Sequence, residues 1–423
     1  MPQNIGDNSI STVGIARITL EDAERLTKYR LKAGDIVYSR RGDVEKRSLV
    51  RAENDGWLCG TGCLRIRFGE GHVVPEYAAF YLGHPLTRAW VVQHAVGATM
   101  PNLNTKILAS LPFVLPPLGE QYAIAEMLTT LDDKIELNRQ MNETLEAMAQ
   151  AIFRDWFVDF GPTRRKIEGA SDPVEIMGDL VTDAGRAQVL ADLFPTRLGD
   201  NGLPEGWEEK PFSVLLSDTI GGDWGKEAPE GQDCHRVAII RGTDFPEIVA
   251  GGVGKVPSRF TSSKKAERRN LTAWDILVEV SGGSPTQPTG RSILITQSVI
   301  DRFQSDVVCA SFCRRFRATD EEVALLAYQH LTNLYAEGGT WKYQNQSTGI
   351  SNFQTTHFLE AELVVWSGRP VIREFAELVR PLMELKNRNE NMVLSATRDL
   401  LLPKLVSGEI RLQDADEVLE AAQ

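Results

Sequence analysis

Residues 120–157 read EQYAIAEMLTTLDDKIELNRQMNETLEAMAQAIFRDWF, a stretch that contains neither glycine nor proline. Its apolar residues recur at alternating steps of four and three, the spacing of a helix whose apolar stripe faces another helix. Pro116 and Pro117 exclude an earlier helical start, and Gly161-Pro162 is expected to end the helix. The predicted seam of this helix consists of Ile124, Leu128, Leu131, Ile135, Asn138, Asn142, Leu145, Ile152 and Trp156.

A second periodic stretch runs from Pro370 to Leu402 and matches the first, since KNRNENMVL (386–394) aligns with LNRQMNETL (137–145). Single asparagines at seam positions lower the stability of a helix pair but fix its register. We therefore predict that the two helices pack on each other in antiparallel fashion. The predicted seam of the second helix consists of Phe375, Leu378, Leu382, Leu385, Asn389, Met392, Ala396 and Leu400.

The segments before these two helices repeat each other 240 to 250 residues apart. LKAGDIVYSRRGD (31–43) aligns with LTAWDILVEVSGG (271–283), and GATMPNLNTKIL (97–108) aligns with TGISNFQTTHFL (348–359). Both copies read as a turn, strands rich in Ile, Val and Tyr, and helical text in the same order. This agreement predicts that a whole domain is duplicated, and two copies are too few for a solenoid.

The predicted fold class is α+β, with two similar mixed α/β domains separated by a long antiparallel pair of coiled-coil helices that are related by pseudo-twofold symmetry. We name residues 1–117 the first head and residues 203–368 the second head. The first head has no counterpart of LPEGWEEKPFSVLL (203–216), so we expect it to be shortened at its start. The other predicted parts are a central spacer helix (118–160), a linker with a short helix (161–202), a C-terminal spacer helix (369–411) and a tail (412–423).

The bulk composition is that of a globular protein, with 42% hydrophobic and 25% charged residues and a formal net charge of −12. Neither a membrane-spanning apolar run nor a signal peptide is recognisable, so we expect a cytoplasmic protein. Cys59/Cys63 and Cys309/Cys313 each form a C-x3-C pair inside strand-like text, and we interpret them as buried thiols rather than zinc ligands. No phosphate-binding loop, methyltransferase motif or carboxylate cluster stands out, so we predict no catalytic residue and no metal site.

A stiff spacer between two similar heads suits a target with two separated half-sites, and duplex DNA is such a target. Basic side chains would contact phosphates, while amides and lysines would read base edges. Two alternatives stay open. In one the basic clusters are solvated loops, and in the other the matched Asn102 and Asn352 cap turns or helices. The candidate DNA contacts are Arg40, Arg41, Arg47, Asn102, Asn104 and Lys106 in the first head, and Lys264, Lys265, Arg268, Arg269, Gln344, Asn345, Gln346, Asn352 and Gln354 in the second.

The chain resembles the specificity (S) subunits of Type I restriction–modification systems. The resemblance is carried by LPPLGEQYAIAEMLTTLDDKIELNRQMNETLEAMAQAIFRDWFVDFGP (115–162), by the opening of the second head (203–216) and by RDLLLPKLVSGEIRL (398–412). It implies that each head is a target recognition domain that reads one half of a bipartite double-stranded DNA site. It also implies that the paired helices set the spacing and dock two modification (M) subunits, which bind S-adenosylmethionine and methylate adenine. Restriction (R) subunits, which use ATP and Mg²⁺, complete the assembly, and this chain itself is expected to be non-catalytic and to hold no cofactor.

The shortened start of the first head leaves a second interpretation from another functional class. In that interpretation the first head no longer reads DNA, and the chain is an assembly scaffold or regulator of the partner subunits. A bipartite recognition sequence favours the DNA reader, whereas salt-sensitive binding without any consensus sequence favours the scaffold.

Overall fold

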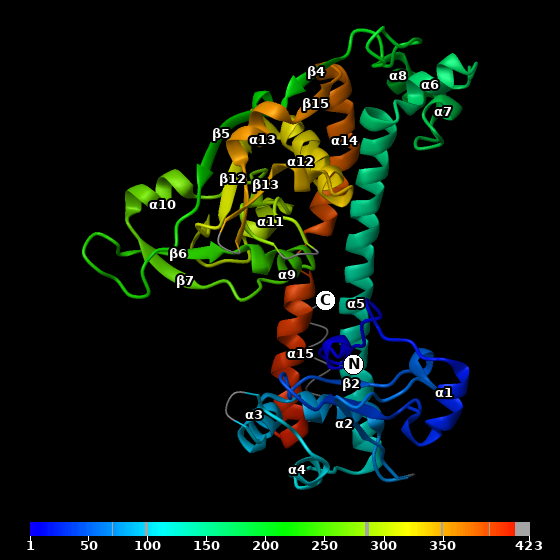
Figure 1. Cartoon of the computed structure of the whole chain (residues 1–423), viewed down its shortest axis with the longest axis vertical. Coiled ribbons are helices and arrows are strands. Elements are labelled where there is room, and N and C mark those ends of the chain that lie inside the picture. Colours follow the sequence, from blue (N-terminus) through cyan, green and yellow to red (C-terminus); the bar gives the residue numbers. More distant parts are fainter. Residues whose placement is uncertain (70, 98–99, 284–286, 348–349, 389, 411–423) are drawn as a thin grey trace. The chain divides into compact units, whose positions relative to one another are not determined.

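The computed structural model describes residues 1–69, 71–97, 100–283, 287–347, 350–388 and 390–410 (Figure 1). The chain divides into two compact units, and each is described here by itself. Unit 1 comprises Met1–Glu136 with Val393–Gln423, and unit 2 comprises Leu137–Met392. The long helix α5 (Leu118–Phe153) contributes its first part to unit 1 and its second part to unit 2.

Unit 1 is built on a small antiparallel sheet with the strand order β2-β1-β3. All four residues of its central strand are buried, because the apolar run of this strand is covered on both faces. The strands are β1 (Ile36–Ser39), β2 (Arg47–Leu49) and β3 (Cys63–Ile66); the helices are α1 (Leu20–Arg25), α2 (Pro75–Gly83), α3 (Pro85–His94), α4 (Thr105–Ala109) and α15 (Glu390–Ser407), with single 3₁₀ turns at Pro2–Asn4, Thr27–Tyr29 and Ala52–Asn54.

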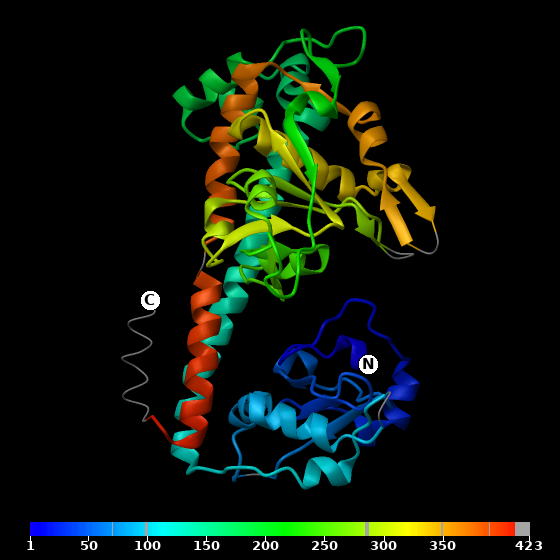
Figure 2. The ribbon, with the colours of Figure 1, turned by 90° about the vertical axis from the view of Figure 1, so that its left-hand side faces the viewer.

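In unit 1 the helices α5 and α15 pack side by side, as Figure 2 shows. Four predicted seam residues of α5 are buried in one apolar cluster with leucines of α15. An ion pair of 2.7 Å joins Asp132 to Arg398 across the pair, and the chain directions of α5 and α15 are opposite. The cluster contains Ile124, Leu128, Leu131 and Ile135 from α5 and Leu394, Leu401, Leu402 and Leu405 from α15.

Unit 2 contains the second part of α5, a single π turn (Arg154–Val158), and the second head. Its strands are β4 (Glu208–Pro211), β5 (Leu216–Gly221), β6 (His235–Ile240), β7 (Ser258–Thr261), β8 (Ile276–Glu279), β9 (Ser281–Gly282), β10 (Ser292–Leu294), β11 (Asp306–Cys309), β12 (Cys313–Ala318), β13 (Gln344–Ser347), β14 (Ile350–Phe353) and β15 (Leu363–Trp366). Its helices are α6 (Gly161–Ile167), α7 (Pro173–Ile176), α8 (Ala184–Asp192), α9 (Phe245–Val249), α10 (Ser263–Arg269), α11 (Gln297–Ile300), α12 (Glu321–Ala336), α13 (Thr355–Ala361) and α14 (Arg369–Lys386), with 3₁₀ turns at Phe212–Leu215, Gly242–Asp244 and Gly339–Tyr343.

The buried apolar residues of the second head form three clusters, and its strands form several small sheets. Their orders are β10-β8-β12-β5, β11-β6-β7, β13-β14-β9 and β15-β4. The apolar core beneath them is continuous with the helices α12 and α14 and with the aromatic end of α5. Three predicted seam residues lie in this core, namely Ile152, Trp156 and Phe375, and Leu378 and Leu382 are half-buried against it. Leu145 is buried outside this cluster.

The central sheets of the two heads share three strands in the same order and register, and the second sheet has β5 as a fourth strand. In the first head Ile36 faces Leu49 and Ile66, and in the second head Ile276 faces Leu294 and Phe316. Each sheet also carries a matching ion pair, Asp35 with Arg67 at 2.6 Å and Asp275 with Arg317 at 2.7 Å. The duplication predicted from the sequence is therefore confirmed at the level of strand pairing.

Three expectations about the helices are corrected. The π turn follows the end of α5 at Phe153, and Gly161-Pro162 begins a new helix, α6, rather than only ending the old one. The expected linker (161–202) is folded into α6, α7 and α8, which pack against the core through residues such as Leu190 and Phe194. The expected C-terminal spacer helix is two helices, because α14 ends at Lys386 and α15 begins at Glu390.

The break between α14 and α15 changes which residues of the predicted seam of the second helix are buried. Met392 is half-buried, Ala396 is exposed and Leu400 is 51% exposed, so these three do not form the buried seam. Asn138 donates from its Nδ2 atom to Oδ1 of Asn391 at 2.9 Å and to Oε2 of Glu390 at 3.1 Å, so its described partners lie at the start of α15. Asn389 lies outside the described residues.

The two cysteine pairs also differ from expectation. Cys309 ends β11 and Cys313 begins β12, so the pair spans a turn between two strands rather than one strand. Both thiols are buried and free, and burial raises the pKa of Cys309 to about 12. Cys59 and Cys63 are free but only half-buried. Within the described ranges, no helix is both long and apolar enough to cross a membrane, and no three His, Cys, Asp or Glu side chains are grouped to hold a metal ion.

Candidate DNA interface

The repeated polar loops add a backbone bridge at the end of the central strand of each head. The backbone N–H of Leu103 donates to the carbonyl of Arg40 at 2.9 Å, and that of Phe353 donates to the carbonyl of Val280 at 2.8 Å. Leu103 and Phe353 are both buried, which anchors the loops. The recurrence of the loop is therefore explained by fold geometry.

The asparagines of these loops have structural partners. Asn102 and Asn352 form β-bridges with Arg41 and Ser281, respectively, and the Ser281 hydroxyl donates to Oδ1 of Asn352 at 2.6 Å. The capping role considered for Asn102 falls instead on Asn104, whose Oδ1 accepts from the N–H of Ile107 at 2.9 Å at the start of α4. The exposed Lys106 follows in the first turn of α4.

The polar hairpin of the second head, β13 and β14 beside β9, holds several predicted base readers. Both polar atoms of the Gln344 side chain are hydrogen-bonded within the second head. Its Oε1 accepts from the N–H of Thr289 at 2.9 Å, and its Nε2 donates to Ser351 at 3.0 Å. Asn345 is exposed on β13. Gln346 belongs to the same strand, but its side chain lies outside what the structure describes.

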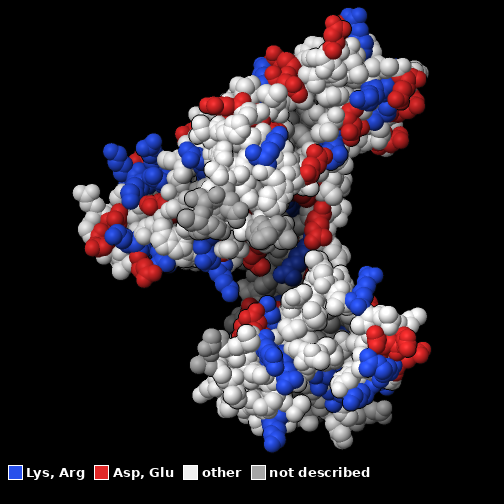
Figure 3. Space-filling model, viewed as in Figure 1, with Lys and Arg blue, Asp and Glu red and all other residues white. Residues whose placement is uncertain are grey.

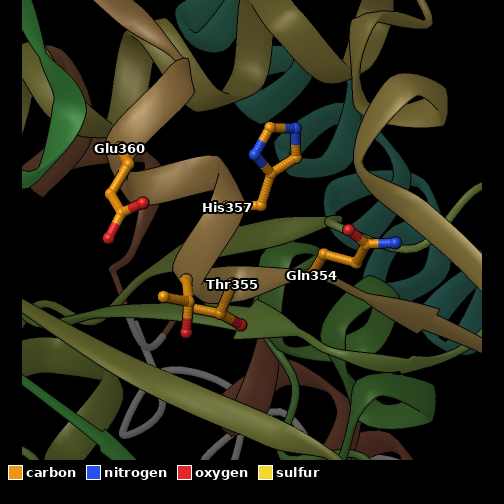
Figure 4. Close-up of a pocket in the computed structure, with 5 residues that line it drawn as sticks. Gln354, Thr355, His357 and Glu360 are labelled. Carbon is orange, nitrogen blue, oxygen red and sulfur yellow. The ribbon is translucent and has the colours of Figure 1, made fainter.

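An open hollow of about 420 Å³ adjoins the end of this hairpin. Its lining is polar and comes from Gln354 and from the first turns of α13, as Figure 4 shows. Because Gln354 and His357 are exposed, their polar ends are available to an external ligand. The lining residues are Gln354, Thr355, Thr356, His357 and Glu360.

Helix α10 presents the basic cluster of the second head (Figure 3). Ser262 caps the helix and the buried Ala266 anchors it, so Lys264, Lys265 and Arg268 stand on its exposed side. Lys265 forms an ion pair of 3.6 Å with Asp223, but its side chain is 50% exposed, and such surface pairs are weak, so the ammonium group stays accessible to solvent. Arg269 differs, because its Nε donates to the carbonyl of Gly221 at 3.1 Å and thereby ties α10 to β5.

Arg47 of the first head is not available for the phosphate contact predicted from the sequence. Its side chain is 4% exposed; its guanidinium pairs with Asp7, and its Nε donates to the carbonyl of Ala79 at 3.1 Å. Burial alone would raise the pKa of Asp7, but the charges and hydrogen bonds of Arg47 and Arg88 outweigh burial and lower that pKa. Arg40 is half-buried and Arg41 is exposed, so Arg41 is the more accessible of the two.

The helices before the central strands of the two heads carry opposite charge. Helix α1 and helix α10 share the tripeptide Ala-Glu-Arg (23–25 and 266–268), and each begins with a hydroxyl cap, Thr19 or Ser262. The two residues before this tripeptide are Glu21 and Asp22 in α1 but Lys264 and Lys265 in α10. The first head therefore lacks the basic charges that the second head presents at this place, a difference that the shared tripeptide could have revealed in the sequence.

A buried carboxylate holds the base of the polar hairpin. Glu362 accepts from the Tyr343 hydroxyl at 2.6 Å and from Lys342 at 2.9 Å, and its other oxygen lies 2.9 Å from Nε2 of His330. Burial acts to raise the pKa of Glu362, but the hydrogen bonds from His330, Tyr343 and Lys342 outweigh it and lower the pKa to about 2. The folded state therefore holds Glu362 in its charged form.

We expect the substitution Glu362→Gln to destabilise the chain strongly at pH 7 and weakly near pH 2. A carboxyl whose pKa falls on folding stabilises the folded state above its unfolded pKa of 4.5, and this stabilisation is lost as the pH falls toward about 2. The difference in unfolding free energy between the two proteins should shrink by about 3 kcal/mol over that range. Urea unfolding at pH 7 and pH 2 measures it. Glu360→Gln on the exposed side of α13 is the matched control, and a pH-independent difference for Glu362→Gln would contradict the assignment.

Comparison with known proteins adds the following. A family model described as Type I restriction modification DNA specificity domain matches residues 4–147. The Type I restriction enzyme HindI specificity subunit of Haemophilus influenzae is 27% identical over 430 residues, covering 92% of this chain and 90% of that protein. The MjaIX specificity subunit of Methanocaldococcus jannaschii is 24% identical over 347 residues, covering 81% and 70%. The crystal structure of a Type I restriction–modification S subunit from M. genitalium aligns over 90% of this chain and 84% of its own, with 14% identity and a TM-score of 0.44.

Proposed function

We propose that this chain is a Type I restriction–modification specificity subunit, the DNA-recognition subunit of such a complex, because it is similar to specificity subunits over most of its length. Each head reads one half of a bipartite DNA site. The observation that carries this proposal is the matched strand register of the two heads, because two equivalent domains in one chain suit two separated half-sites. We propose a cytoplasmic location, where the DNA target lies.

The helices supply the spacer in this proposal. Within each unit α5 packs antiparallel against α15 or α14, and the proposed arrangement joins both pairs into one pseudo-twofold coiled coil that sets the distance between half-sites. The same helices dock two modification subunits, and restriction subunits complete the assembly. S-adenosylmethionine, ATP and Mg²⁺ belong to these partners, while this chain contributes recognition and geometry without catalysis.

Each predicted contact residue is assigned either to DNA or to the fold. The assignment depends on whether its side chain is exposed and whether it already binds a residue of its own unit. Phosphate contacts fall to the exposed basic residues, and base contacts fall to polar side chains at the hairpin and at the start of α13. Arg47, Arg269, Gln344, Asn352 and Asn104 are assigned to the fold instead, because each has a partner inside its own unit. The proposed DNA contacts are Arg40, Arg41, Asn102 and Lys106 in the first head, and Lys264, Lys265, Arg268, Asn345, Gln346 and Gln354 in the second.

The test is to map adenine methylation in cells that express this chain with its modification subunits. We expect methylated adenines in a sequence with two defined parts and a gap of constant length. Cells that express the modification subunits alone are the control and should show no such sequence. Complex formation without any consensus sequence would favour the alternative, an assembly scaffold whose first head does not read DNA.

A further inference from the structure

Helix α13 of the second head is the equivalent of helix α4 of the first head. The two loop bridges place Leu103 and Phe353 at matching positions, so matching residues here differ by 250 in number. On this count each helix begins with a threonine, and the residue before each is an amide, Asn104 or Gln354. Positions that build the fold should match between the two helices, and positions that read different bases should differ.

The inward side of both helices anchors them to the core of their own head. Phe358 of α13 is fully buried, and its ring lies 5.0 Å from the ring of Phe212 and 5.1 Å from that of Phe353. Its equivalent in α4, Leu108, packs against the core of the first head. Because Phe358 is enclosed by aromatic rings, the outward side chains of α13 project from an element that is fixed in place, as base readers require.

The outward side of the two helices carries different chemistry. Thr356 and Glu360 are one helical turn apart, are exposed and line the open hollow together with Gln354 (Figure 4). The equivalent residues of α4 are Lys106 and Ser110, which are exposed as well. A hydroxyl and a carboxylate in one head therefore stand where an ammonium and a hydroxyl stand in the other. This is the pattern expected of positions that read two different half-sites.

The carboxylate of Glu360 is available to an external donor. Among the residues that the structure describes, no Lys, Arg or His side chain forms an ion pair with it. A carboxylate that faces DNA is repelled by the phosphates, so it is favourable there only where a donor of the DNA meets it. In the major groove cytosine is the one base that presents only a donor, its amino group, and Glu and Asp are the side chains that accept from it. Lys106 fits the acceptor atoms of guanine by the same rule.

We propose that Glu360 on the outward side of α13 determines one base pair of the half-site that the second head reads. Its carboxylate accepts a hydrogen bond from the amino group of a cytosine, so this half-site contains a G·C pair at that position. At the equivalent place in the first head, Lys106 of α4 donates to the guanine of a G·C pair in the other half-site. The inference rests on the proposed DNA-recognition function and names the base that one residue of each head reads.

The test maps adenine methylation in cells that express the modification subunits with the chain variant Glu360→Gln. Glutamine pairs with adenine, so we expect one G·C position of a single half-site to become A·T, while the other half-site and the gap keep their sequence and length. Lys106→Gln should cause the same kind of change in the other half-site only. Glu247→Gln, which alters an exposed glutamate on α9 of the second head, is the control and should leave the methylated sequence as it is.

Binding of the purified complex to two duplexes gives a second readout that does not need methylation. The unaltered complex should bind the original duplex at least about tenfold more tightly than a duplex with the G·C pair replaced by A·T. The Glu360→Gln complex should lose or reverse this preference, whereas the Glu247→Gln complex should keep it.

Three outcomes overturn the proposal. The first is a Glu360→Gln complex that keeps both the original methylated sequence and the original preference between the two duplexes. The second is a change in both half-sites at once, and the third is a half-site of the second head that contains no G·C pair. In each of these cases the unaltered chain still directs methylation to a bipartite sequence. Failure of the proposed function differs, because the unaltered chain itself then gives no defined sequence, and the inference falls with it.

Discussion

Replacing Leu131 with aspartate is expected to separate α5 from α15 in unit 1. Leu131 is 4% exposed and lies in the apolar cluster with Leu394 and Leu401. The substitution removes a buried leucine and places a charge in its cavity, which costs at least about 3 kcal/mol of unfolding free energy. Hydrogen exchange in α15 should rise steeply, and the first thermal transition should fall by several degrees or vanish. Under the proposed function the variant also loses its co-purifying modification subunits.

The matched control for this experiment is Leu137→Asp on the same helix. Leu137 is 65% exposed, so the same chemical change should alter the stability by no more than about 0.5 kcal/mol. If Leu131→Asp leaves exchange in α15 as slow as Leu137→Asp does, the packing of α15 on α5 in unit 1 is wrong.

The helix that contains Leu131 was predictable because its sequence leaves no other choice. Residues 120–157 lack glycine and proline, and the steps of four and three place one apolar stripe along a helix. The structure buries Ile124, Leu128 and Ile135 of that stripe. The central strands were predictable for a similar reason, since a duplicated sequence must satisfy the same pairing twice. The ion pairs of Asp35 and Asp275 show how closely the two copies agree.

The break between α14 and α15 could not be found from the same pattern. No glycine or proline marks it, and it is held by contacts to residues far along the chain. Nη2 of Arg302 donates to the carbonyl of Asn387 at 2.9 Å, and Nδ2 of Asn391 donates to the carbonyl of Ala250 at 3.0 Å. The break shifts the phase of the stripe, so Leu401 is buried while Leu400 is exposed. Tertiary contacts therefore interrupt the single helix that the continuous heptad pattern predicts.

The folded region between α5 and the second head was predicted only as a linker with a short helix, because its apolar residues follow a weak period. Trp156, Phe194 and Trp207 meet in one aromatic cluster, with the rings of Trp156 and Phe194 edge to face at 5.0 Å. Such a cluster joins separate short segments, and only the packed structure brings them together. Single aromatic residues in polar text are the one signal that the sequence offered.

For the candidate interface, residue type was predictable but availability was not. Arg47 and Lys264 look alike as basic residues in polar text, yet Arg47 is buried against Asp7 while Lys264 is exposed on α10. The partner that removes Arg47 from the surface lies forty residues earlier in the chain. Charge alone therefore identifies phosphate contacts only after the ion pairs inside the fold are known.

The double substitution Lys264→Glu and Lys265→Glu is expected to weaken DNA binding of the assembled complex by at least tenfold at 0.1 M salt, by the loss of phosphate contacts. Both side chains are exposed on α10, whose anchor Ala266 is untouched, so the fold of the second head should be retained. Each phosphate contact contributes about 0.9 to the slope of log affinity against log salt, so the slope should become shallower by up to about 2. Equilibrium binding to a duplex that carries the methylated sequence, measured over a range of salt concentrations, gives both quantities.

The control is Lys255→Glu, an exposed lysine of the same head that lies outside α10. It changes the net charge of the chain in the same direction but removes no proposed contact, so the salt slope should keep its value. A weaker affinity with an unchanged slope in the double variant would mean that Lys264 and Lys265 do not contact phosphates. Loss of methylation at one half-site only, with the other half still recognised, would assign α10 to the half-site that the second head reads. The acidic Glu21 and Asp22 of α1 predict that the first head holds its half-site without this helix.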